Sequence, residues 1–273
     1  ARGFKVSCDS ISKFFMRHSK TLAKIRAGKP ARMAVLGHFV PSFIHHAASS
    51  GFDVIWLDME HRTFSDSQIA ALLAHFHLAD IDCMLRPPTV EKTRLYRYLE
   101  DGAAGLMIPH VSTAEKAREL VAAVKFPPLG DRGLDGAGLD ANYYLNDAEA
   151  YIEEANRETF LVVQIETMEA FHQVDETAAV PGVDVMFIGP GDLGWRLGRS
   201  NPDGLAMEQV FEKVAAAAAR EGIAWGCPSR SAEHVAELRG QGAQLIAYGG
   251  DFMALKNMLE EHGRELEEVY GGE

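Results

Sequence analysis

The chain has little cysteine, no long apolar run and no excess of basic charge, and each shortage excludes a class of protein. Its three cysteines include no Cys-x-x-Cys pair, which argues against a disulfide framework and favours a reducing, cytoplasmic setting. No run of about 18 apolar residues is present, so we expect no membrane span. The 27 Lys and Arg against 39 Asp and Glu give a net charge of −12, which argues against nucleic acid or an anionic membrane as the partner.

A glycine-rich fingerprint is also missing after the first predicted strand, where a dinucleotide-binding fold would need it. Short apolar strands instead alternate eight times with helical segments of about 10 to 15 residues. This repeat predicts an α/β fold, a (β/α)8 TIM barrel, with a doubly wound open sheet as the alternative. The predicted strands are 33–39, 53–58, 82–86, 105–109, 160–165, 185–188, 223–227 and 244–248.

Three segments fall outside the repeat. Apolar residues at helical spacing predict a helix over 10–27 and a last helix over 252–269, and a long excursion precedes the fifth strand. We expect one domain over 1–273, which consists of an N-terminal helical extension (1–30), the barrel (31–251) and a C-terminal helix (252–273).

Two predicted strands end abruptly in a carboxylate. The run 160–165 leads into Glu166, and the run 185–188 leads through Gly189-Pro-Gly191 into Asp192. Because the carboxyl ends of barrel strands meet at one end, two hard oxygen ligands would lie together there, as in a Mg²⁺ or Mn²⁺ site with open positions for a substrate. The alternative is that each acid is only a helix cap or a surface acid.

Other predicted strands also end in polar residues. His61 suits proton transfer, because histidine is the side chain whose ordinary pKa lies nearest neutrality, and Asp58 lies close enough in sequence to fix its tautomer. Arg86 offers a planar fork for a carboxylate or a developing enolate oxygen. The alternatives are a helix-capping turn for Asp58 and His61, and a salt bridge from Arg86 to Asp58 or Glu60.

The glycine turn and two more histidines are weaker candidates. Gly189 and Gly191 would let backbone N–H groups approach an anion, or would simply form a tight turn. His38 and His110 lie near the ends of the first and fourth strands and would line the site or have a structural role.

Together these motifs resemble those of the HpcH/HpaI aldolase family, the class II, metal-dependent pyruvate aldolases of the phosphoenolpyruvate/pyruvate barrel superfamily. The resemblance runs from about Gly28 to about Glu260. The stretches that carry it are Gly51-Phe-Asp-Val-Ile-Trp-Leu-Asp-Met-Glu-His61, Phe126-Pro-Pro-Leu-Gly-Asp-Arg-Gly133, and Val163-Gln-Ile-Glu-Thr167 with Phe187-Ile-Gly-Pro-Gly-Asp-Leu193.

The resemblance implies a role for each matching residue. Glu166 and Asp192 would hold a divalent metal (Mg²⁺, Mn²⁺ or Co²⁺), and Arg86 would stabilise the enolate oxygen. His61, oriented by Asp58, would be the acid and base. The remaining implied contacts are Gln164 to the substrate or a metal-bound water, and the Gly191 and Asp192 amides to the pyruvate carboxylate.

The implied activity is that of a carbon–carbon lyase. It would cleave a 4-hydroxy-2-oxo acid to pyruvate and an aldehyde through a metal-stabilised pyruvate enolate. No lysine lies at a predicted strand end, which argues against Schiff-base chemistry. The alternatives are an oxaloacetate decarboxylase or macrophomate-synthase-like enzyme, an acyl-CoA lyase of the citrate-lyase β type, and a metabolite-binding barrel without catalysis.

Two further expectations concern partners and substrate choice. The resemblance implies a homo-oligomer, a hexamer or trimer of dimers, in which the C-terminal helix packs on or swaps into a neighbouring barrel. The sequence departs from the family pattern after Gly133 and at Arg62. We expect the loop 134–144 to cover the site and to select the aldehyde, and Arg62 to reach a second carboxylate or to be solvated.

Overall fold

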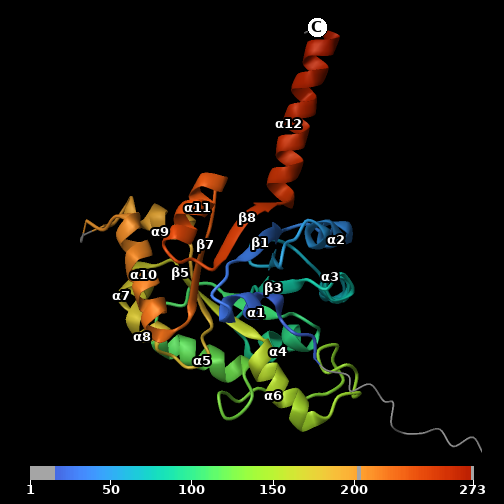
Figure 1. The fold of residues 1–273 in the computed structure, drawn as a ribbon, viewed down its shortest axis with the longest axis vertical. Helices are drawn as coiled ribbons and strands as arrows, with labels where there is room; N and C mark the ends of the chain where they lie inside the picture. Colours follow the sequence, from blue (N-terminus) through green and yellow to red (C-terminus); the bar gives the residue numbers. More distant parts are fainter. Residues whose placement is uncertain (1–15, 202–203, 272–273) are drawn as a thin grey trace, which may run out of the picture.

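The computed structural model describes residues 16–201 and 204–271, and its centre is a barrel of eight parallel strands (Figure 1). Each strand pairs with the next along the chain, and β8 pairs with β1, which confirms the predicted (β/α)8 barrel. The strands are β1 (Ala31–Leu36), β2 (Val54–Asp58), β3 (Asp82–Arg86), β4 (Gly105–Ile108), β5 (Phe160–Ile165), β6 (Val185–Ile188), β7 (Ala224–Pro228) and β8 (Leu245–Gly250).

Helices surround the strands. In the described residues they are α1 (Lys20–Arg26), α2 (Pro41–Ser49), α3 (Asp66–Ala79), α4 (Lys92–Glu100), α5 (Ala114–Val124), α6 (Ala148–Glu158), α7 (Met168–His172), α8 (Val174–Ala178), α9 (Pro190–Leu197), α10 (Met207–Glu221), α11 (Ala232–Gly240) and α12 (Asp251–Tyr270).

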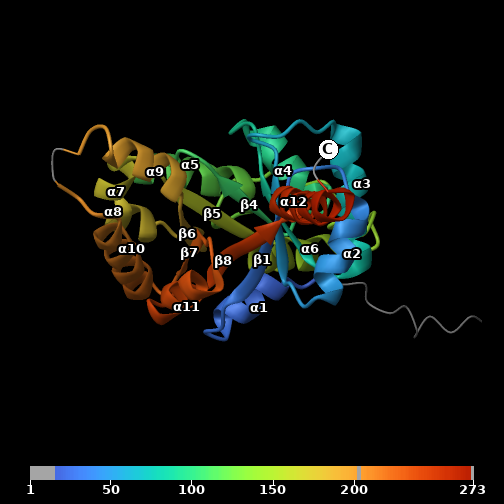
Figure 2. The ribbon, with the colours of Figure 1, turned by 90° about the horizontal axis from the view of Figure 1, so that it is seen from above.

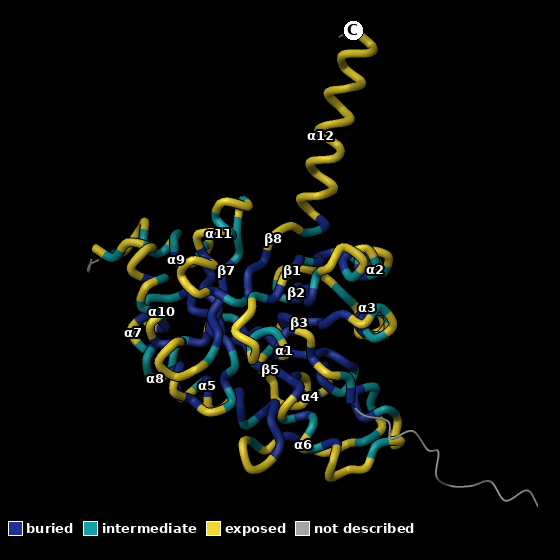
Figure 3. The backbone as a smooth tube through the Cα atoms, in the orientation of Figure 1, coloured by how far each residue is buried: buried dark blue, intermediate teal, exposed yellow. Residues whose placement is uncertain are grey.

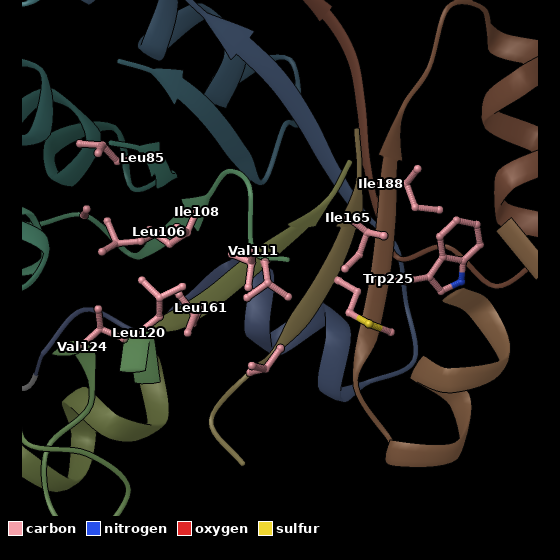
Figure 4. Packing of buried hydrophobic residues seen from close by; sticks show 14 of the residues in the cluster. Leu85, Leu106, Ile108, Val111, Leu120, Val124, Leu161, Ile165, Ile188 and Trp225 are labelled. Carbon is pink, nitrogen blue, oxygen red and sulfur yellow. The ribbon is translucent and has the colours of Figure 1, made fainter. Parts of the chain in front are cut away.

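The side chains of β5 alternate between two apolar layers. Phe160 and Val162 belong to a cluster inside the barrel, whereas Leu161 and Ile165 pack in the larger cluster between the strands and the helices (Figure 4). Every residue of β5 and β6 is therefore buried. This explains the unbroken apolar runs in the sequence, and it leaves the strand ends as the place for polar residues.

The N-terminal helix is shorter than the sequence pattern predicts. Residues 10–15 lie outside the described part of the chain, and residues 16–19 are not helical. The helix begins at Lys20 because the Ser19 side chain accepts a hydrogen bond from the Leu22 N–H and so caps its first turn.

Two helices, α6 and α9, were not predicted. The sequence pattern indicates a turn around Pro190, yet this residue is the first of α9. Proline is tolerated there because the first N–H groups of a helix have no hydrogen-bond acceptor within the helix. The helix α6 lies inside the excursion before β5 and is capped by the Asp147 side chain. The helical segment after β5 is interrupted at Gln173, which separates α7 from α8.

The excursion between α5 and α6 runs along the outer side of α4 and does not cover the barrel. Lys92, at the start of α4, lies 2.6 Å from an Asp131 carboxylate oxygen. The guanidinium of Arg132 is buried and donates to Asp140 and to the Tyr151 hydroxyl, both at 2.9 Å. The expectation that this loop covers the site is thus wrong for the single chain, because the buried Arg132 anchors it elsewhere.

The last helix, α12, projects away from the barrel (Figures 1 and 3). Figure 2 views it nearly along its axis, with β8 leading into it. Asp251 is its only buried residue within the described range. No helix of the described residues, α12 included, is long and apolar enough to cross a membrane.

Candidate active site

Arg86, the last residue of β3, is the centre of a buried polar network at the carboxyl ends of the strands. Its Nε and Nη2 form a fork with Asp58 at 3.0 and 2.9 Å, and its Nη1 lies 3.0 Å from Glu60. The guanidinium also lies 4.5 Å above the Trp56 ring and 3.4 Å from the Gln164 amide oxygen. A planar cation held on several sides has one orientation, as a residue that stabilises charge needs.

Asp58 and His61 are joined through the backbone. One Asp58 carboxylate oxygen accepts the N–H groups of Glu60 at 3.1 Å and of His61 at 3.4 Å, so it shapes the turn after β2. The His61 imidazole lies 3.6 Å from the Glu60 carboxylate, and its side chain is 55% exposed. The structure therefore places the Asp58 carboxylate on the Arg86 fork and on this turn, and the His61 ring beside Glu60.

Glu166 follows β5 and is 3% exposed. Its carboxylate accepts the backbone N–H of His110 at 2.6 Å and lies 3.1 Å from the Nδ1 of that ring. His110 holds a left-handed backbone conformation, φ 53°, and so turns its N–H toward the acid. Burial raises the pKa of the Glu166 carboxyl above its ordinary value, the His110 N–H opposes this shift, and the charges of Glu60 and Asp192 add to it.

The start of α9 leaves room beside Glu166. A side chain at Gly189 would place its Cβ 2.7 Å from a Glu166 carboxylate oxygen, so only glycine fits there. A Cβ at Gly191 would meet nothing within 4 Å, which marks open space. Asp192 is exposed in the first turn of α9, where N–H groups point out of the helix and favour an anion.

The structure brings most of the predicted residues to one end of the barrel. Arg86, Asp58 and Gln164 are in direct contact, and Glu166 interacts electrostatically with Asp192. Glu60, expected only as a salt-bridge partner of Arg86, bridges Arg86 and the imidazoles of His61 and His110. The position of Glu60 in the sequence, between Asp58 and His61, was the signal that could have identified it. His110, a weak candidate, proves to be the partner of Glu166.

The donor set fits a divalent metal. Within 16–201 and 204–271, no group of three or more His, Cys, Asp or Glu is arranged to hold a metal. Two hard carboxylates, Glu166 and Asp192, with open space over Gly191 nonetheless match a cation that keeps waters and takes substrate oxygens as ligands. Burial is the main cause of the raised pKa of Glu166, and the nearby charges of Glu60 and Asp192 add to it, so a bound cation would favour the ionised carboxylate.

Comparisons with known proteins agree with this geometry. Residues 33–257 match the family model described as HpcH/HpaI aldolase/citrate lyase. A hydroxypyruvate/pyruvate aldolase of Deinococcus radiodurans is 34% identical over 83% of this chain and 82% of its own length. A 2-keto-3-deoxy-L-rhamnonate aldolase of Klebsiella pneumoniae is 32% identical over 78% of this chain and 80% of its own.

The solved structures give the same result. The HpcH/HpaI aldolase from Desulfitobacterium hafniense DCB-2 superposes with a TM-score of 0.85 at 31% identity, over 92% of this chain and 98% of that one. Macrophomate synthase shares the fold with a TM-score of 0.79 at 24% identity, over 94% of this chain and 93% of its own. The chain belongs to the HpcH/HpaI aldolase/citrate lyase family.

Proposed function

We propose that this protein is a metal-dependent carbon–carbon lyase that cleaves a 4-hydroxy-2-oxo acid to pyruvate and an aldehyde. The observation that carries the proposal is the position of Arg86, whose guanidinium is fixed by Asp58 and Glu60 and reaches Gln164, two residues before Glu166 in β5. A positive charge with one orientation beside a pair of hard carboxylates suits a 2-oxo acid that gains negative charge.

Each of these residues would have a distinct role in bond cleavage. A divalent cation held by Glu166 and Asp192 would supply a Lewis acid for the 2-oxo group. His61 would take the proton of the 4-hydroxyl group as the C3–C4 bond breaks, and the bonding electron pair moves into the pyruvate half. Arg86 would stabilise the negative charge that develops on the 2-oxo oxygen, and a proton returned to C3 would complete pyruvate. The N–H groups of Gly191 and Asp192 would bind the carboxylate.

Removal of the metal tests the proposal. We expect pyruvate release from 4-hydroxy-2-oxoheptanedioate to stop in EDTA and to return with Mg²⁺, Mn²⁺ or Co²⁺, measured by a coupled assay. Oxaloacetate is the second substrate, because decarboxylation passes through the same enolate, and the ratio of the two rates separates lyase from decarboxylase. Release that is indifferent to EDTA would contradict a metal at Glu166 and Asp192. No release from either compound would favour an acyl-CoA lyase or a binding protein.

We also propose that α12 packs against a second copy of this chain. Its exposed apolar side chains include Leu255, Leu259 and Leu266. A barrel helix ordinarily covers its own strand, but α12 projects, and the outer side of β1 and β8 has a cavity of about 540 Å³ whose lining includes Ile246 and Tyr248. Lysine and arginine side chains also line this cavity, and the second half of α12 is rich in glutamate, so the two surfaces are complementary in charge.

Light scattering after size-exclusion chromatography checks this packing. We expect the protein to run at a multiple of 29.9 kDa, a hexamer or trimer of dimers, and the double variant Leu259→Asp, Leu266→Asp to run as a monomer, because two buried charges would break an apolar contact. Asn257→Asp is the matched control, since on a helix Asn257 lies roughly opposite Leu259. A monomeric wild-type protein would contradict the proposal.

The compartment that suits this enzyme is the cytoplasm. Cys83 and Cys227 are free and buried, and burial raises the pKa of both thiols, which disfavours the reactive thiolate. Free thiols are usual in proteins of a reducing compartment.

A further inference from the structure

A second group of polar side chains lies beside this site at the same end of the barrel, where β1, β2 and β8 finish. Its centre is the Phe252 ring, in the first turn of α12. The His38 ring lies against it with centroids 4.0 Å apart, and the Arg62 guanidinium carbon lies 4.4 Å from its centroid. The ring occupies the space above Gly37, where a Cβ would come within 2.4 Å of a ring carbon. One aromatic ring thus supports a histidine and an arginine.

Asp251 holds His38 in place. Its carboxylate is 4% exposed and accepts the backbone N–H groups of Gly37 and His38, and its Oδ2 lies 2.6 Å from the His38 Nδ1. An ionised carboxylate can only accept, so the hydrogen lies on Nδ1. The other ring nitrogen, Nε2, is then the one available to a ligand, and the His38 side chain is 41% exposed.

Arg62 is held flat without a carboxylate partner. Its Nη1 donates to the backbone oxygen of His61 at 2.8 Å, and the guanidinium stacks on Phe252. No acid of the described residues forms an ion pair with it, in contrast to Arg86, which has two. A stacked guanidinium keeps an edge free for two parallel hydrogen bonds to a carboxylate.

The position of Arg62 places it on the side of the site toward which the aldehyde half of the substrate would extend. It directly follows His61, the group proposed to take the proton from the 4-hydroxyl, while the pyruvate-binding residues follow β3, β5 and β6. In the closed strand order β1 and β5 lie opposite each other. A substrate whose oxo-acid half lies at Glu166 and whose 4-hydroxyl faces His61 therefore directs the rest of its chain toward β1, Arg62 and His38.

We propose that Arg62 and His38 form the subsite for the aldehyde half of the substrate, and that this half carries a carboxylate. The inference rests on the proposed lyase function and names its substrate class, a 4-hydroxy-2-oxo dicarboxylate. Arg62 donates two parallel, charge-assisted hydrogen bonds to this carboxylate. His38 provides the second polar contact, donating from Nε2 when its ring carries both hydrogens, with Nδ1–H held by Asp251. Arg62 is exposed to solvent, but Phe252 and the His61 oxygen fix the orientation of its guanidinium.

Two substrates of the same chain length test the subsite, 4-hydroxy-2-oxoheptanedioate and 4-hydroxy-2-oxoheptanoate, which differ only in the terminal carboxylate. We expect the wild-type enzyme to favour the dicarboxylate in kcat/KM. Arg62→Gln should lower kcat/KM for the dicarboxylate roughly 10- to 100-fold, as the loss of a charged hydrogen-bond pair does, and change that for the monocarboxylate less than about 3-fold. His38→Gln should act in the same direction with a smaller effect.

Arg62→Lys and Arg118→Gln complete the set. The lysine keeps the charge but not the fork, so it should fall between the wild type and Arg62→Gln. Arg118 is an exposed arginine on α5, on the outer side of the barrel, and its replacement should leave both substrates unaffected. A wild-type enzyme that does not prefer the dicarboxylate, or an Arg62→Gln variant that loses both substrates equally, would overturn the subsite while the lyase function stands. Metal-dependent pyruvate release from neither substrate would overturn the function itself.

Discussion

Replacement of Arg86 by lysine should lower kcat for pyruvate release by about 100- to 1,000-fold, the effect of removing one donor from a charge-stabilising site. Lysine keeps a positive charge near Asp58, but a single ammonium group cannot hold Asp58, Glu60 and the reacting oxygen at once. Steady-state kinetics with saturating metal measure the effect. We expect KM to change little, because the lost interaction belongs to the transition state.

Two further variants separate chemistry from folding. Arg86→Leu would leave the buried Asp58 without its partner, which costs about 3–5 kcal/mol of unfolding free energy, so it tests structure and not mechanism. Arg118→Lys, on the outer side of α5, is the control for a conservative change of charge group. A kcat for Arg86→Lys within about 3-fold of the wild type would exclude Arg86 from charge stabilisation.

The substitution Glu166→Gln should lower activity at saturating Mn²⁺ by at least about 100-fold and weaken Mn²⁺ binding by at least about 10-fold. Glutamine has the same shape and can still accept the His110 N–H, but it brings no charge to a cation. Isothermal titration with Mn²⁺ measures the binding without turnover. Glu119→Gln, an exposed acid on α5, is the matched control.

The stability of the metal-free variant adds an independent check. Burial raises the pKa of Glu166, so the ionised carboxylate is disfavoured in the folded state, and glutamine removes that charge. The Tm of metal-free Glu166→Gln should therefore equal or exceed that of the metal-free wild type. Unchanged Mn²⁺ affinity would show that Glu166 is not a ligand.

The barrel could be predicted because its signal is repeated. Most strands are buried on both faces, so an unbroken apolar run marks them, and β5 and β6 show this most clearly. Elements that depend on a single local contact were missed or misplaced. The helix α1 begins where the Ser19 hydroxyl caps it, and α9 begins with a proline that the sequence pattern marks as a turn. Neither start follows from periodicity.

The location of the candidate site could be predicted from the sequence, but most of the side-chain contacts within it could not. Strand ends identified Glu166, Arg86 and Asp192, because the geometry of a barrel brings those ends together. The partners were harder, since side-chain contacts depend on three-dimensional packing. The sequence favoured Asp58 beside the His61 ring and gave a salt bridge from Arg86 to Asp58 only as the alternative, which is the contact observed. It placed the loop after Gly133 over the site, but the buried Arg132 fixes this excursion along α4.

Phe252 has two structural roles. As the second residue of a 20-residue helix about 30 Å long, it lies at the base of α12, whose far end would contact a second copy in the proposed assembly. Its ring is also the surface on which Arg62 and His38 rest. If α12 packs on a second copy as proposed, a displacement of this helix would move the ring under Arg62. Substitutions that alter assembly and substitutions that alter substrate preference would then act on the same ring. Assembly and substrate preference would therefore be coupled at this residue.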